Sequence, residues 1–119
     1  MTACVSQSVV IDYADGEQEC FHFKGYDASD GYISRCFEPS THDSYMVDII
    51  RAAGAVVIAK TNCPQTMLVA ESDNNVFGQA KNPVVSHLTC GGSSGGEGSV
   101  IAFRGSALGI GTDVGGSIR

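Results

Sequence analysis

Glycine is concentrated near the C-terminal end of this sequence. Ten of the 15 glycines lie in residues 91–119, and four of them flank the serine pair of the stretch TCGGSSGGEGS (89–99). Glycine loses more backbone freedom on folding than any other residue, so such a cluster is costly unless the backbone must bend tightly or approach another group. The sequence therefore predicts a tightly bent loop around Ser93 and Ser94, and it poses the question of what these hydroxyls do.

The rest of the composition is that of one modest globular domain. The chain has 119 residues, of which 43% are hydrophobic, and a formal net charge of −6. Its seven basic residues are scattered, which argues against a nucleic-acid or anionic-membrane partner. No apolar run approaches the ~20 residues of a membrane span. The first residues lack a basic start followed by a long apolar stretch, so no signal peptide is expected.

Cysteine usage argues against a zinc site and a disulfide scaffold. The cysteines are odd in number and widely spaced, and no Cys-x-x-Cys pair occurs. We therefore expect free thiols, no metal and a reducing compartment, which makes the location cytoplasmic. The cysteines are Cys4, Cys20, Cys36, Cys63 and Cys90.

Apolar spacing predicts alternating helices and strands. Residues 41–54 predict a helix whose apolar residues recur at i, i+3, i+4 and i+7. The run AVVIA (55–59) follows at once and is typical of a buried strand. A second helix is expected between Gly95 and Gly105, with a strand within 107–113. This alternation predicts an α/β layered architecture. The apolar face of the first helix would consist of Met46, Ile49, Ile50 and Ala53.

The other segments give weaker signals. Residues 9–23 contain two β-prone runs around Asp15-Gly16, which predicts a hairpin. Pro64 is expected to open a short helix over residues 65–70. Residues 24–40 and 71–90 lack a regular period and predict loops.

Three chemistries could use a glycine-flanked serine pair. A Walker-type phosphate loop requires Gly-Lys-Ser/Thr, and no lysine follows Lys81. A nucleophile elbow fits Gly-x-Ser-x-Gly with Ser93 at its centre, but all three histidines precede the motif instead of following it. A serine hydrolase without histidine needs another base, and serine–lysine pairs are a known solution. A second Gly-Gly-Ser element at Ser117 would then place two hydroxyls in series.

Two blocks of sequence resemble the amidase signature family. They are GGSSGGEG (91–98) and GSALGIGTDVGGSIR (105–119), and the spacing between them also fits. RAAGAVVIAKTNCPQTM (51–67) and ESDNNVFGQAKNP (71–83) resemble the branch with fungal acetamidases and fatty-acid amide hydrolases. The resemblance covers about residues 19–119. It implies a partial, truncated amidase domain there, with a layered α/β/α fold and a mixed central sheet, after a non-matching segment over 1–18.

The resemblance assigns roles to particular residues. Members of the family hydrolyse or transfer amides through a serine–serine–lysine triad. Ser117 matches the nucleophile, and Ser93 matches the bridging serine, which follows a cis peptide bond in the family. The oxyanion hole would consist of the backbone N–H groups of Val114, Gly115, Gly116 and Ser117. Supporting hydrogen bonds would come from Ser94, Thr112, Asp113 and Arg119.

The base of this triad is missing from the matching position. The family lysine directly precedes the segment that resembles ECFHFKGYD (19–27), and Gln18 stands there. A glutamine amide has no basic nitrogen and cannot accept a proton at neutral pH. Lys60 and Lys24 are possible replacements. The place of Lys60 directly after the predicted strand favours a structural role, and Lys24 is expected to be a surface residue.

Two functional hypotheses follow from this pattern. The first is an amide hydrolase that acts on a small-molecule amide through an acyl-enzyme and needs no cofactor. The second is a catalytically inactive amidase-like product with at most a binding or regulatory role, because Gln18 replaces the lysine.

Overall fold

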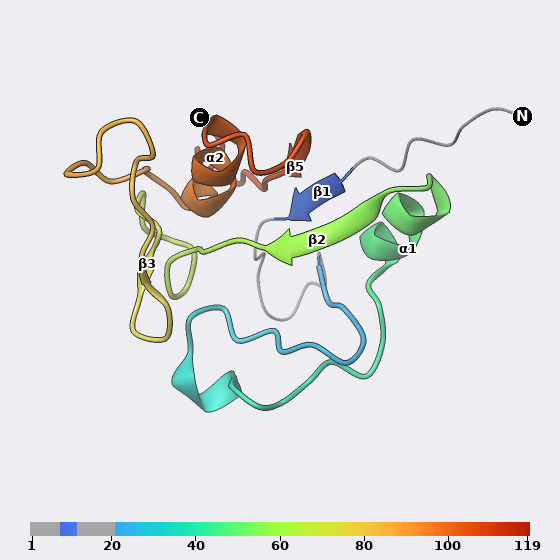
Figure 1. Ribbon diagram of the computed structural model, residues 1–119. Helices are drawn as coiled ribbons and strands as arrows, with labels where there is room; N and C mark the ends of the chain where they lie inside the picture. The colour runs from blue at the N-terminus through green and yellow to red at the C-terminus, as the bar shows by residue number, and fades with distance from the viewer. Residues whose placement is uncertain (1–7, 12–20) are drawn as a thin grey trace, which may run out of the picture.

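The fold is a small open α/β structure. The computed structural model describes residues 8–11 and 21–119. Figure 1 shows the sheet at the centre, with α1 and α2 beside it and the β3–β4 hairpin at the far end of the molecule from α1. The elements are β1 (Ser8–Ile11), the 3₁₀ helix η1 (Ile33–Arg35), α1 (Tyr45–Ala52), β2 (Val56–Lys60), β3 (Asp73–Asn74), β4 (Gly78–Gln79), α2 (Gly95–Ala102) and β5 (Leu108–Ile110).

The main sheet is parallel in the part of the chain that the structure describes. Its order is β2-β1-β5, so β1 lies between two strands that come much later in the sequence. Val9 pairs with Val57 on one side and with Leu108 on the other. The separate β3–β4 pair is antiparallel. Parallel strands joined through helices confirm the predicted α/β class.

The apolar core lies between α1 and residues 21–23. Phe21, Phe23, Val47 and Ile50 are buried together. The helix at this position was predicted, but its expected apolar face was wrong in part. Met46 and Ile49 are 40% and 44% exposed. The helix is rotated so that Val47 and Ile50, one turn apart, face the two phenylalanines.

Four further predictions differ from the structure. The strand that was expected to be buried is β2, in which Val56 and Ile58 are 49% and 50% exposed. The first run of the expected hairpin is β1, which pairs in parallel, and residues 21–23 form no strand; the turn at Asp15-Gly16 lies outside the described residues. The helix expected over 65–70 is absent, because Thr66 and Met67 have φ of 71° and 54°, outside the right-handed helical region. Residues 71–90 are more ordered than expected, since they contain the β3–β4 hairpin.

The glycine cluster is explained by close backbone approach. A Cβ on Gly92 would overlap the backbone of Glu71, and a Cβ on Gly96 would overlap the backbone of Asn62. The Gly96 N–H also donates to the Asn62 carbonyl oxygen at 3.1 Å. The segment around Ser93 and Ser94 (residues 91–96, the serine loop) therefore packs backbone against backbone on two other segments. Only glycine leaves room for this contact.

Substitution of two α2 glycines tests this explanation. Gly96→Ala should lower the free energy of unfolding by about 1–3 kcal/mol, as overpacking does. Gly98 is the matched control, because it lies in the same helix and a Cβ there meets nothing within 4 Å. Gly98→Ala should raise the free energy of unfolding by about 0.5–1 kcal/mol. Urea denaturation measures both, and equal effects would refute steric exclusion at residue 96.

Candidate active site

The two glycine–serine motifs lie side by side in the structure. Ser93 and Ser94 directly precede α2, and Ser117 follows β5. The Ser94 N–H donates to the Ser117 carbonyl oxygen at 3.2 Å. Ser93 is 3% exposed, and the Gly92–Ser93 peptide bond is cis, as the resemblance implies. Two segments that were matched separately in the sequence therefore form one local unit.

Two hydrogen bonds between Ser94 and Thr112 hold the two motifs together. The Ser94 hydroxyl donates to the Thr112 carbonyl oxygen at 3.0 Å and accepts the Thr112 N–H at 3.1 Å. The backbone N–H and carbonyl groups of Thr112 therefore both find a hydrogen-bond partner in the buried side chain of Ser94. Ser94 and Thr112 were both expected to supply hydrogen bonds, and here they bond to each other.

Asp113 closes the turn that leads to Ser117. Its carboxylate accepts the N–H groups of Gly116 at 2.6 Å and Ile118 at 3.2 Å. The Arg119 guanidinium adds two bonds, at 3.0 and 3.1 Å. The hydrogen bonds from Arg119, Ile118 and Gly116 hold the pKa of the Asp113 carboxyl well below its usual range. Asp113 is therefore an ionised brace for this turn.

The expected oxyanion donors lie on the same turn, residues 114–117. The Gly116 N–H already donates to Asp113, whereas Val114 and Gly115 lie on an exposed surface. Gly116 has φ of +135°, a conformation that favours glycine.

The residue at the position of the family lysine is Gln18, and its possible replacement as a base is Lys60. Gln18 lies outside the described residues. Lys60 ends β2, where its Nζ lies 3.4 Å from the Asp27 carbonyl oxygen and 5.8 Å from the centre of the Phe23 ring. It lines a cleft of about 370 Å³ along β2 together with Tyr26 and Arg51. Within the described part of the chain, no serine of either motif lines this cleft.

Burial lowers the pKa of Lys60 to about 8, an effect opposed by the nearby Asp30, Cys63 and Asp27. A lysine of this kind is more easily deprotonated than a surface lysine. Its ammonium group nevertheless lies against the Phe23 ring and the Asp27 carbonyl oxygen.

The lowered pKa of Lys60 predicts a pH dependence. Between pH 8 and 10.5 the unfolded chain binds a proton at Lys60 that the folded chain releases. The free energy of unfolding of the native chain, relative to that of Lys60→Met, should therefore rise with pH across this window and stay constant below it. Urea denaturation of both proteins at a series of pH values measures the difference. A flat difference would show that the ammonium group is not buried.

Two residues of the site region were not anticipated from the sequence. Glu97, which is 5% exposed, accepts the Thr61 hydroxyl at 2.8 Å and the Ile110 N–H at 2.7 Å, so it connects α2 to the end of β2 and to β5. The sequence does mark Glu97, because it is the only Asp, Glu, Lys or Arg between Lys81 and Arg104. The second unanticipated residue is Ser72, and no feature of the sequence marks it.

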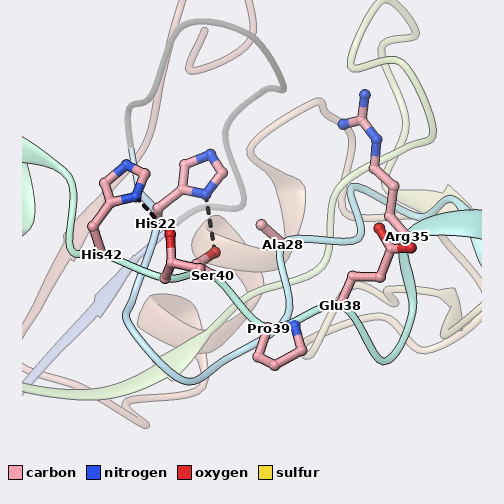
Figure 2. A pocket seen from close by; sticks show the side chains of 8 residues that line it. His22, Ala28, Arg35, Glu38, Pro39, Ser40 and His42 are labelled. Carbon is pink, nitrogen blue, oxygen red and sulfur yellow. Dashed lines mark hydrogen bonds between the residues drawn. The ribbon is translucent and has the colours of Figure 1, made fainter.

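His22 and His42 belong to a separate hollow (Figure 2). The His22 Nδ1 lies 3.0 Å from the Ser40 hydroxyl, and the His42 Nδ1 lies 3.3 Å from the Thr41 hydroxyl. The two rings are nearly parallel, with centroids 5.9 Å apart. The hollow has a volume of about 390 Å³ and is lined by His22, Ala28, Arg35, Glu38, Pro39, Ser40, Thr41 and His42.

Over residues 8–11 and 21–119, no group of three or more His, Cys, Asp or Glu side chains could hold a metal ion. In the same residues, no helix is long and apolar enough to cross a membrane. Cys36, Cys63 and Cys90 are free thiols, and burial raises the pKa of Cys90.

The structure is that of an α/β protein in which two glycine–serine turns adjoin beside an open parallel sheet. The family model described as Amidase matches residues 18–119. The chain therefore belongs to the amidase family.

Known relatives agree with this assignment. The chain is 52% identical over 96 residues to an acetamidase of Aspergillus oryzae, a match that covers 81% of this chain and 18% of that protein. It is 46% identical over 102 residues to fatty acid amide hydrolase 1 of Caenorhabditis elegans, covering 86% and 18%. A solved structure of fatty acid amide hydrolase superposes with a TM-score of 0.83 at 33% identity, covering 93% and 18%. The chain spans about a fifth of the length of these relatives.

Proposed function

We propose that this chain carries the serine pair of a small-molecule amide hydrolase. The observation that supports this most directly is the contact between the motifs, in which the Ser94 N–H donates to the Ser117 carbonyl oxygen. Membership of the amidase family and likeness to an acetamidase and a fatty acid amide hydrolase support the same reaction class.

The proposed reaction uses the serines in sequence. The Ser117 hydroxyl attacks the amide carbonyl carbon and passes its proton to Ser93, whose own proton goes to the base. Backbone N–H groups of Val114, Gly115 and Ser117 stabilise the oxyanion, while that of Gly116 contributes only when it leaves Asp113. Collapse breaks the C–N bond, and the amine leaves with a proton. Water then hydrolyses the ester on Ser117 and releases the acid.

Gln18 favours a second candidate function for the chain as it stands. Without a basic group in the lysine position, the proton from Ser93 has no acceptor, so an inactive protein with a binding or regulatory role is the alternative. The family membership and the serine contact are compatible with both functions. We also infer a cytoplasmic location, which the free thiols support.

The order of the two serines can be tested by covalent labelling. In the Gln18→Lys variant, extended with the remainder of the Aspergillus oryzae acetamidase, a fluorophosphonate should modify Ser117. Ser117→Ala should abolish the label, because the nucleophilic oxygen is lost, and Ser93→Ala should slow labelling by ~10²-fold or more, because the proton relay is cut. Mass spectrometry locates the adduct. An adduct on Ser93 would reverse the two roles and favour the nucleophile-elbow hypothesis.

The missing base can be tested in the same extended protein. The Gln18→Lys variant should hydrolyse a small aliphatic amide about 10²–10⁴-fold faster than the form that retains Gln18, which corresponds to the usual contribution of a general base. Ammonia release measures the rate, and Lys60→Ala is the control in both backgrounds. Equal rates with and without the Gln18→Lys substitution, with activity lost on Lys60→Ala, would identify Lys60 as the base.

A further inference from the structure

Ser72 lies at the centre of the contacts that shape the serine loop. It is 1% exposed and directly precedes β3. Its hydroxyl lies 2.9 Å from the Gly91 carbonyl oxygen and 3.0 Å from the Ser93 carbonyl oxygen, and it accepts the Gly95 N–H at 2.9 Å. The single hydroxyl proton is shared between these two carbonyl oxygens, so one side chain contacts three backbone groups of the loop.

The position of Ser72 is itself fixed by backbone and side-chain contacts. Its carbonyl oxygen accepts the Asn62 Nδ2 at 3.0 Å and the Ala80 N–H at 2.9 Å. The Asn62 carbonyl oxygen in turn accepts the Gly96 N–H. Asn62 and Ser72 thus connect the segment after β2, the β3–β4 hairpin and the serine loop in one hydrogen-bonded unit.

We propose that Ser72 is a positioning residue for the reaction, one that fixes the place of Ser93 relative to Ser117. This inference rests on the proposed amide hydrolase function. A hydroxyl within hydrogen-bond distance of the carbonyl oxygens of Gly91 and Ser93 restrains the Gly91–Gly92 and Ser93–Ser94 peptide units, which flank the Gly92–Ser93 peptide bond. A displacement of about 1 Å in a catalytic group can cost 10²-fold in rate. Loss of the Ser72 hydroxyl should therefore slow the serine chemistry without removing any reacting group.

The first test measures the loop and needs no reactivity. Amide hydrogen exchange is followed by NMR in the native chain, Ser72→Ala and Ser99→Ala. Ser99 is the matched control, because its hydroxyl also donates to a backbone carbonyl, that of Lys81 at 2.8 Å, but lies further along α2. In Ser72→Ala the Gly95 amide should exchange at least about tenfold faster, because it loses its acceptor, while the Phe103 amide at the end of α2 is unchanged. Ser99→Ala should leave Gly95 unchanged.

Two exchange results would overturn the proposal. One is an unchanged Gly95 amide in Ser72→Ala. The other is equal acceleration of Gly95 and Phe103, which would mean that the substitution only destabilises the whole fold.

The second test separates positioning from folding in the extended Gln18→Lys protein, because the native chain lacks the base. With a fluorophosphonate, Ser72→Ala should lower the maximal labelling rate at Ser117 by about tenfold or more and leave the final labelled fraction unchanged. A lower fraction at an unchanged rate would indicate partial unfolding and overturn the proposal, as would an unchanged rate with a loosened Gly95. If the extended Gln18→Lys protein is not labelled at all, the proposed hydrolase function fails, and hydrogen exchange alone decides whether Ser72 positions the loop.

Discussion

The contact of the serine loop with Asn62 and the Glu71–Ser72 pair is the constraint on which the site depends. At Gly92 and Gly96 the loop backbone touches other backbone directly, with no side chain between them. Such contact fixes positions more tightly than interdigitating side chains, which can change rotamer. It also explains why so short a loop contains so many glycines. The serine hydroxyls are placed by a rigid backbone surface that comes from two segments after β2, at Asn62 and at Glu71–Ser72.

Ionic groups divide the molecule into two regions. Near the serines, the Asp113 carboxylate binds N–H groups and Arg119 within its own turn, and Glu97 bonds across α2, β5 and the end of β2. Near β2, the ammonium group of Lys60 lies against an aromatic ring and a carbonyl oxygen. Near Ser117 the carboxylate of Asp113 thus accepts N–H groups and braces the turn, whereas Lys60, whose pKa is lowered, lines another cleft.

Much of the fold could be predicted from the sequence, because the signals for α1, β2, α2 and β5 are local. Apolar period and glycine boundaries located these elements to within a few residues. The pairing of β1 could not be predicted, since its partners are distant in the chain. In the site, the motif resemblance located both serine turns. It missed Ser72, whose importance arises from contacts with residues about twenty positions away, and no local pattern marks such a residue.

The central place of β1 has a consequence for how the site forms. Val9 pairs with Leu108, so the strand that leads to Ser117 joins the sheet only by closing almost the whole chain into a loop. Contacts between distant residues are slow to form, because chain entropy is lost before they contribute. The helix α1 and the β3–β4 hairpin need only neighbouring residues. In folding, β5 should therefore join β1 late, whereas the contact between Ser94 and Thr112 links residues only 18 positions apart and can form before it.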